Sequence, residues 1–296
     1  MSEEIRELIS SLEGAEVSNE LIAWIRETCQ PEQLVVDALV KEFTENLGTD
    51  EDYCNSILKA LLLLHQAAED LVAPQFAANQ DFIPALIHYL NNTSIEKLEG
   101  SAFMLFTRVF DPNTHCAVVD LEFVSKLFES FGFLKSETVI KDCATILLKL
   151  SSMSENVSAN PVLEICESHP NHRYFAEVLC MLVNKGNPKT DSYLYQFVKD
   201  YYSYTSTPLF LKNDLMVMID VLLDQVVEVV SVKGVGQLVL ECLDALVSTQ
   251  EYQAIKYRSD EFAKLLTQFK SMGSLGSIRK DNFELFKSIC DKVQSN

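Results

Sequence analysis

Apolar residues recur at intervals of three and four along almost the whole chain, and this spacing constrains the fold more than any other feature. Side chains at such intervals share one face of an α-helix, which has 3.6 residues per turn. Val35, Leu39 and Phe43 show the pattern between Pro31 and Gly48. No segment alternates at every second residue for long enough to predict a strand. The expected helices are residues 18–29, 31–48, 50–71, 81–90, 94–110, 121–131, 136–150, 161–166, 172–184, 190–204, 213–230, 237–247, 260–270 and 277–293.

Glycine supports this helix assignment by its position. Eight of the nine glycines fall at breaks between the expected helices, and Gly100 alone lies inside one. Glycine (9) and proline (8) together make about 6% of the 296 residues, against roughly 12% in average usage. So few turn-forming residues argue against a β-sandwich or barrel, which needs many short strands and turns. The chain is therefore predicted to be all-α.

Several expected helices are apolar on nearly two faces, notably residues 57–64 and 215–230. A helix that is apolar around most of its circumference must be covered on both sides, as inner helices of a stacked repeat are. The richest apolar segments recur about every 40 residues, which is the period of armadillo and HEAT repeats. The sequence predicts a single domain over residues 1–296, an irregular armadillo/HEAT-like helical repeat stack.

Charge excludes two classes of partner. Lys+Arg 24 minus Asp+Glu 43 gives a net charge of −19, which argues against binding to nucleic acid or to an anionic membrane surface. Purely apolar runs such as residues 60–64 are far shorter than the roughly 18 residues of a spanning helix. The acidic N-terminus has no apolar signal-peptide core, and the eight cysteines are scattered without a C-x-x-C. We expect no membrane partner, a reducing compartment and a cytoplasmic location.

The acidic excess is uneven along the chain. Residues 1–52 contain 14 acidic and 3 basic side chains, a net of −11, whereas residues 253–287 contain 7 basic and 4 acidic, a net of +3. A solvated face that keeps the protein soluble is the simpler interpretation. The functional interpretation is an electrostatic surface that steers partner proteins of opposite charge.

Motifs for catalysis or metal binding are weak. Cys166, His169 and His172 are spaced at three, but Pro170 should break the shared helical face, so a helix–loop–helix junction is favoured over a metal site. The adjacent His115 and Cys116 follow a turn-like segment and are interpreted as a chance pair. The chain has no Gly-rich phosphate loop, no G-x-S-x-G and no H-E-x-x-H. We expect no enzyme activity, no cofactor and no metal.

A tyrosine-rich segment and several basic residues are the candidate partner-binding sites. On one helix Leu194, Phe197, Val198 and Tyr201 would face inward, which leaves other tyrosines partly exposed, and tyrosine is enriched at interfaces. Packing within a loop is the alternative. The candidate contact residues are Tyr195, Tyr202, Tyr204, Lys212, Lys256, Arg258 and Lys264.

The string from Leu209 to Leu223 follows Ser206-Thr207-Pro208 and combines an apolar lead-in with Asn213-Asp214-Leu215 and a hydrophobic run containing Ile-Asp. Locally it predicts a helix capped by Asn213. This string resembles a signature of the WISH/DIP family, and residues 252–266, with Lys256-Tyr257-Arg258, are similar to the family's next helices. The resemblance covers residues 205–270, about a fifth of the chain, and fits the compact form that has no SH3 domain.

Members of this family are armadillo-type activators of the actin-related protein 2/3 complex. The resemblance implies a non-enzymatic nucleation-promoting factor that acts without a preformed filament and seeds linear actin filaments. The implied partners are that complex and actin, and the implied location is the cortical actin cytoskeleton. No two prolines have P-x-x-P spacing, so no SH3-mediated partner is expected. The alternative is an unrelated armadillo-like adaptor that regulates formins or kinases.

Overall fold

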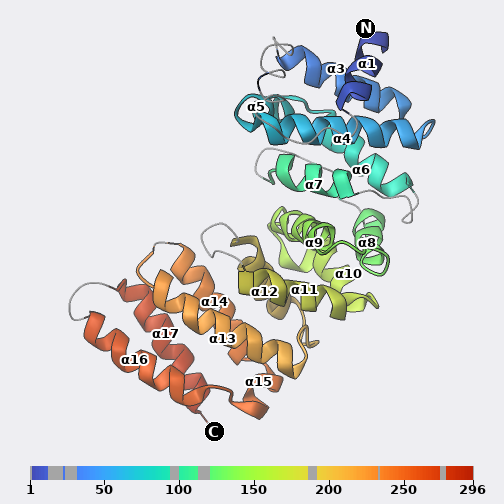
Figure 1. Ribbon diagram of the computed structural model, residues 1–296. Helices are drawn as coiled ribbons and strands as arrows, with labels where there is room; N and C mark the ends of the chain where they lie inside the picture. Colours follow the sequence, from blue (N-terminus) through green and yellow to red (C-terminus); the bar gives the residue numbers. More distant parts are fainter. Residues whose placement is uncertain are drawn as a thin grey trace. The chain divides into compact units, whose positions relative to one another are not determined.

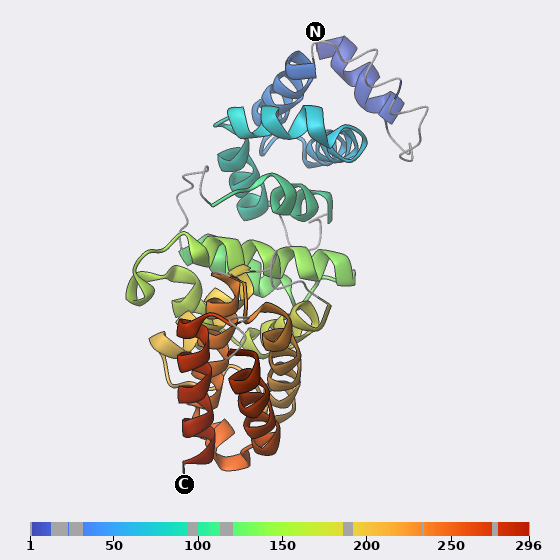
Figure 2. The same ribbon diagram turned by 90° about the vertical axis from the view of Figure 1, so that its left-hand side faces the viewer.

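The computed structural model describes residues 2–12, 23, 32–93, 100–112, 121–185, 192–232, 234–273 and 278–295. The chain packs into two compact units, residues 1–149 (unit 1) and 150–296 (unit 2). Within the described ranges every regular element is a helix, which confirms the all-α prediction. Figures 1 and 2 show the helices of each unit. The predicted single domain over residues 1–296 stays a prediction.

Unit 1 is built around a long helix that is buried on nearly all sides. This helix, α4, packs against α1, α3, α5 and α7, and Figure 1 shows it between α3 and α7. Its residues 60–65 are all buried, as the two-faced apolar pattern predicts. The helices of this unit are α1 (Ser2–Leu12), α3 (Glu32–Asn46), α4 (Glu51–Ala67), α5 (Glu69–Ala78), α6 (Phe82–Asn92), α7 (Gly100–Val109), α8 (Leu121–Ser130) and α9 (Glu137–Ser152), which extends three residues into unit 2.

The start of α4 follows its sequence signal and its end does not. The Asp50 carboxylate accepts a hydrogen bond from the Tyr53 backbone N–H at 3.0 Å, which caps the first turn. The expected continuation to residue 71 is wrong, because Ala68 leaves the helical region (φ −146°, ψ 53°) and α5 starts at Glu69. Ala68 is buried, and the break lets α5 pack against α3 as well as α4. Alanine carries no turn signal, so the sequence gives no warning of this break.

Unit 2 has α14 at its centre. This helix packs against α12, α13, α15 and α17, and Figure 1 shows α13 and α14 side by side. The elements of this unit are η2 (Val157–Ala159), a 3₁₀ turn, and the α-helices α10 (Pro161–Ser168), α11 (His172–Lys185), α12 (Ser192–Tyr204), α13 (Lys212–Val229), α14 (Val235–Val247), α15 (Gln250–Ile255), α16 (Ser259–Gly273) and α17 (Lys280–Gln294).

A glycine allows the closest approach to α14. Gly236 is the second residue of that helix, although the sequence placed it in a break. A Cβ atom there would lie 2.3 Å from the Val229 carbonyl oxygen and 2.8 Å from Asn282 Nδ2. Only glycine lets the end of α13 and the side chain from α17 come this close, so the residue is needed for packing and not for a turn.

Side-chain hydrogen bonds to the ends of earlier helices repeat through both units. In unit 1 Lys126 Nζ donates to the Thr93 carbonyl at 2.7 Å, and Lys149 Nζ donates to the Thr107 carbonyl at 2.6 Å. In unit 2 Gln225 Nε2 donates to the Val183 carbonyl at 3.4 Å. These pairs are separated by 33, 42 and 42 positions in the sequence. The separations agree with the predicted repeat of about 40 residues, and the packing is that of an all-α repeat stack.

Further observations concern the expected helices and their boundaries. The short helices α1 and α15 were not expected, and residues 18–29 lie outside the described ranges apart from residue 23. The helix α13 begins at Lys212, so Asn213 lies in its first turn and is not the cap. The position before the helix is occupied by Leu211, whose side chain makes no capping hydrogen bond.

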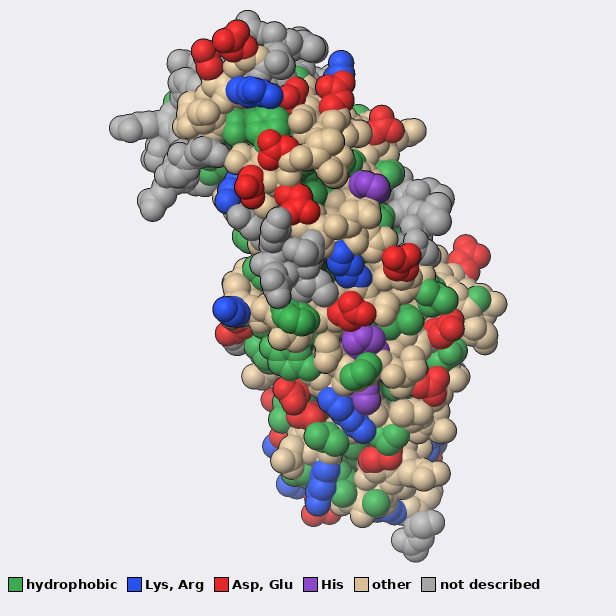
Figure 3. Space-filling view, turned by 90° about the vertical axis from the view of Figure 1, so that its right-hand side faces the viewer, with side chains coloured by type: hydrophobic (Ala, Val, Ile, Leu, Met, Phe, Trp, Pro, Cys, Tyr) green, Lys and Arg blue, Asp and Glu red, His purple; other side chains and the backbone are tan. Residues whose placement is uncertain are grey.

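Surface charge in unit 1 is dispersed on the face that Figure 3 shows. There, separate Asp and Glu side chains alternate with Lys, Arg and neutral groups over the N-terminal part of the chain. Among the described residues no helix is both long enough and apolar enough to cross a membrane.

Candidate functional site

The candidate contact residues all lie in unit 2, on α12 and around α13, α15 and α16. The expected inward face of α12 is confirmed, because Leu194, Phe197, Val198 and Tyr201 are all buried. The expected exposure of Tyr195 is wrong. Its side chain is 0% exposed, and its hydroxyl donates a hydrogen bond to Gln225 Oε1 at 2.8 Å.

The burial of Tyr195 has a clear packing cause. The helix α12 contacts both α14 and η2, and Gln225 reaches it from α13. Its buried arc is therefore wider than the single helical face that the sequence pattern describes. Tyr195 is thus a core residue whose hydroxyl has found a partner, as buried tyrosines usually do.

Tyr202 and Tyr204 are partly exposed, as expected. The ring of Tyr202 packs edge-on against the buried Tyr201, with 5.5 Å between centroids. Burial of its hydroxyl raises the pKa of Tyr202, although backbone N–H groups of Phe210 and Leu209 that bond to the same oxygen act in the opposite direction. The phenol therefore stays protonated near neutral pH and can act as a hydrogen-bond donor.

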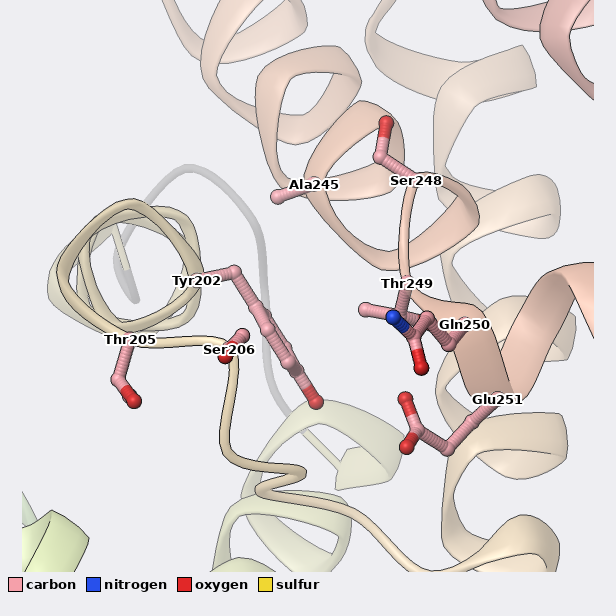
Figure 4. Close-up of a pocket in the computed structure, with 8 residues that line it drawn as sticks. All are labelled: Tyr202, Thr205, Ser206, Ala245, Ser248, Thr249, Gln250 and Glu251. Atoms are coloured by element: carbon pink, nitrogen blue, oxygen red, sulfur yellow. The ribbon is translucent and has the colours of Figure 1, made fainter.

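Tyr202 forms one wall of a pocket of about 300 Å³. Figure 4 shows the ring extending from α12 across the pocket, with its hydroxyl end towards the Glu251 carboxylate. The opposite wall comes from the end of α14 and the start of α15. The lining residues are Tyr202, Thr205, Ser206, Ala245, Ser248, Thr249, Gln250 and Glu251.

The wall at the end of α12 is held by a carboxylate. The hydroxyls of Thr205 and Thr207 both donate to Glu167 Oε1, the latter at 3.1 Å. Thr205 Oγ1 also accepts the Thr207 backbone N–H at 3.1 Å. These bonds fix the loop after α12 against α10, which carries Glu167.

The opposite wall is fixed by its own hydroxyls. Ser248 Oγ donates to the Asp244 carbonyl at 2.7 Å, and Thr249 Oγ1 donates to the Leu246 carbonyl at 2.7 Å. Thr249 also caps α15 by accepting the Tyr252 backbone N–H at 3.2 Å. Both walls are thus rigid, and three pocket hydroxyls already donate to groups of the fold.

Lys256 and Arg258 form a structural loop between α15 and α16. Both have left-handed backbone conformations, with φ of 45° and 59°, which few non-glycine residues adopt. Lys256 Nζ donates to the Ser295 carbonyl at the end of α17. Arg258 Nε lies 2.9 Å from Asp220 Oδ1, and the Tyr257 hydroxyl donates to Asp220 Oδ2 at 3.0 Å.

The Asp220 contacts join the two sequence segments that carry the family resemblance. Asp220 belongs to the Ile-Asp pair in the string from Leu209 to Leu223, and its partners belong to Lys256-Tyr257-Arg258. A strained loop with a carboxylate anchored at both oxygens is consistent with a structural role for these residues. The sequence contained both halves of this contact but did not show that they meet.

The remaining two basic candidates are accessible. Lys212 is exposed at the first residue of α13. The Lys264 side chain is 72% exposed and lies 3.5 Å from Glu261 one turn earlier, a contact that contributes little to stability. Of the seven candidates, Tyr202, Tyr204, Lys212 and Lys264 therefore combine accessibility with no contact that anchors the loop between α15 and α16.

The cysteine and histidine pairs of the sequence form no metal centre in the described part of the chain. Cys166 lies at the end of α10 and His172 begins α11, which confirms the predicted helix–loop–helix junction. The His169 ring accepts the Asn171 backbone N–H at 3.1 Å. No group of three or more potential ligands comes together within the described ranges. The pair His115 and Cys116 lies outside those ranges.

Buried thiols in both units are unsuited to nucleophilic chemistry. Burial raises the pKa of the Cys54 thiol to about 11 and the pKa values of Cys180 and Cys290 to about 12. It also raises the pKa values of Cys143, Cys166 and Cys242. A thiol must ionise to attack a substrate, so these groups behave as small apolar side chains.

Part of this chain is similar to a known protein family. Residues 136–262 match the family model of the SPIN90/Ldb17 leucine-rich domain. This segment of the chain is similar to a SPIN90/Ldb17 leucine-rich domain. The match confirms the predicted resemblance to the WISH/DIP family and extends it from residue 205 back to residue 136. No curated protein matched the chain.

The segment that matches the SPIN90/Ldb17 leucine-rich domain runs from the residue before α9 to the first turn of α16. It includes the Tyr202 pocket, the Asp220 contacts and Lys212, whereas Lys264 lies just beyond its end. The SPIN90/Ldb17 family is not a known enzyme family. The leucines that give the domain its name are largely core residues here, such as Leu222 and Leu243, both 0% exposed.

Proposed function

We propose that this protein is a non-enzymatic actin nucleation-promoting factor. It binds the actin-related protein 2/3 complex and activates it without a preformed filament, so that linear actin filaments form. The match of residues 136–262 to the SPIN90/Ldb17 leucine-rich domain is the observation that carries the proposal. The complex is the main partner, actin is a second one, and the cytoplasmic actin cortex is the place of action.

The mechanism requires only differential binding. A surface that contacts the active arrangement of the complex better than the inactive one shifts the population towards the active state. Helical repeats suit this role because their packed helices present large surfaces of fixed shape. No bond is made or broken by the protein itself, which agrees with the buried, protonated thiols of the described residues.

Actin assembly with purified components tests the proposal. Fluorescent actin, the purified complex and this protein are mixed without preformed filaments, and the lag before assembly is measured. We expect a shorter lag and new linear filaments by microscopy, and no effect when the complex is left out. An unchanged lag together with no capture of the complex from lysate would contradict the proposal. Capture of a formin or a kinase instead would favour an armadillo-like adaptor.

Accessible basic residues provide the test of the partner surface. Lys256, Arg258 and Lys264 are all candidate contact residues, but the first two anchor the loop between α15 and α16. The double variant Lys212→Glu, Lys264→Glu avoids that loop. We expect it to weaken binding to the complex several-fold at low salt and less at high salt. Lys135→Glu, an exposed change outside the matched segment, is the control, and equal binding by both would exclude this surface.

A further inference from the structure

Three hydroxyls that line the Tyr202 pocket have no hydrogen left to donate to a ligand. The hydroxyl hydrogens of Thr205, Ser248 and Thr249 are all committed to Glu167 or to backbone carbonyls. Each of these oxygens also accepts one hydrogen bond, from the Thr207 N–H, Lys292 Nζ and the Tyr252 N–H respectively, so one lone pair on each remains for a ligand. A ligand rich in N–H groups fits this lining better than a carboxylate or a phosphate does.

Two helix ends add negative potential. The pocket lies where α12 and α14 both end, since Tyr202, Thr205 and Ser206 come from the end of α12 and Ala245 and Ser248 from the end of α14. A helix carries a partial negative charge at its C-terminus, which favours cations. The helix that starts at the pocket, α15, has only six residues and an acidic first turn, so its opposing contribution is small.

The carboxylate of Glu251 faces the pocket. Among the described residues, Glu251 makes no hydrogen bond and no ion pair, and Figure 4 shows its carboxylate directed to the same space as the Tyr202 hydroxyl. Lys292 Nζ lies 3.3 Å from Ser248 Oγ of the pocket wall and is ion-paired, because it lies 2.6 and 2.8 Å from the two oxygens of Asp244. The pocket thus has an unpaired anion beside an aromatic ring.

We propose that this pocket binds the guanidinium of an arginine side chain from a protein partner. The planar group stacks on the Tyr202 ring while its N–H groups reach the Glu251 carboxylate and the hydroxyl oxygens, a combination that arginine offers and lysine does not. A volume of about 300 Å³ is at the lower limit for small-ligand sites, which suits one side chain. The inference does not depend on the proposed function in actin assembly.

Fluorine NMR on the full chain tests this assignment directly. The ten tyrosines are labelled as 3-fluorotyrosine, and the Tyr202 signal is identified by its loss in Tyr202→Phe. The probe is an acetylated, amidated tripeptide with arginine between two glycines. We expect a saturable shift of the Tyr202 signal in the millimolar range, roughly that of a single anchored side chain.

Two comparisons decide the result. The same peptide with citrulline, which has the shape of arginine without its charge, should bind at least about threefold more weakly to the unmodified protein. Glu251→Gln should weaken arginine-peptide binding by a similar factor, whereas Glu228→Gln, the same change at an exposed site on α13, should not. Equal binding of the two peptides, or equal affinity of the Glu251 and Glu228 variants, would overturn the proposal.

Discussion

In the two units, different kinds of side chain donate hydrogen bonds to the backbone carbonyls at the C-terminal ends of the helices. In unit 1 lysine ammonium groups do this, with Lys126 at the end of α6 and Lys149 at the end of α7. In unit 2 buried amides do it, with Asn160 at the end of α9, Gln225 near the end of α11 and Asn282 at the end of α13. The lysine that serves the same purpose in unit 2, Lys256, is at the surface.

This difference indicates which charged side chains remain available for contacts with a partner protein. Burial lowers the pKa values of Lys126 and Lys149, because taking an ammonium out of water disfavours its charged form. Helix carbonyls satisfy the hydrogen bonds of these two groups, so they are poor candidates for partner contacts. In unit 2 neutral amides satisfy the buried carbonyls, and charged residues such as Glu251 and Lys264 remain at the surface.

The largest expected effect comes from the tight contact in unit 2. Gly236→Ala would place a Cβ atom against the Val229 carbonyl, which is backbone and cannot move alone, so we expect a loss of about 3 kcal/mol or more. Gly100→Ala in unit 1 is the matched comparison. Its Cβ atom would meet only a methyl group of Val139, at 2.6 Å, and a side chain can adjust.

Urea unfolding combined with hydrogen exchange of α7 and α14 peptides measures both changes. Gly100→Ala should cost about 1 kcal/mol or less, because alanine also favours the helix. A Gly236→Ala variant as stable as the unmodified protein would show that α13 and α14 can separate at no cost. The close approach would then not constrain unit 2.

Replacing one side chain that donates to helix-end carbonyls in each unit tests whether a lysine in unit 1 contributes more to stability than an amide in unit 2. Lys149→Met removes an ammonium that bonds to the Thr107 and Phe110 carbonyls, and we expect a loss of about 2 to 3 kcal/mol. Gln225→Leu removes a neutral amide and leaves the Tyr195 hydroxyl without its acceptor, for a loss of about 1 to 2 kcal/mol. Hydrogen exchange near the ends of α7 and α11 reports each loss locally. A larger loss for Gln225→Leu would reverse the proposed order.

The smallest expected effect is an increase in the free energy of unfolding, caused by Asp142→Asn, and it depends on pH. Burial raises the pKa of Asp142 in α9 to about 6, above the ordinary value of 3.8, although Arg108 opposes the shift. Above pH 6 the folded protein must therefore keep this carboxylate charged, which costs stability, whereas below pH 4 both states are protonated and the cost vanishes. Asp142→Asn should stabilise unit 1 by about 1 to 2 kcal/mol at pH 7.5, after allowance for partial exposure.

Unfolding curves from pH 7.5 to pH 4 check the sign. The advantage of Asp142→Asn should shrink as the pH falls through 6. Asp81→Asn, an exposed change before α6, should show no such trend. A gain that stays constant over this range would show that the carboxylate charge is not its cause.

Sequence periodicity predicted the helices well where a polar or small residue marks an end. Asp50 before α4 and Pro161 at the start of α10 are such marks, and both helices begin where expected. The break at Ala68 was missed because tertiary packing of α5 causes it and no local residue signals it. Tyr195 was misplaced because neighbours cover α12 over more than one face.

The candidate sites were less predictable than the helices. Tyr202 was identified from the local density of tyrosines and the helical spacing, but its pocket depends on Glu251, which another helix supplies. Arg258 was identified as a contact residue for its charge, yet its ion pair with Asp220 holds a loop. In both cases the deciding partner lies far along the chain. One sequence contains both residues of such a pair without indicating that they touch.

Lys126, Lys149 and Gln225 follow the helix carbonyls to which they donate by 33, 42 and 42 residues, which has a consequence for synthesis of the chain. A ribosome adds roughly 5 to 20 residues per second, so each of these three side chains is made about 2 to 8 s after the helix it completes. During that interval water must satisfy the open carbonyls of the nascent helix. Each repeat can then settle within seconds of its successor's emergence, before the last residues have been translated.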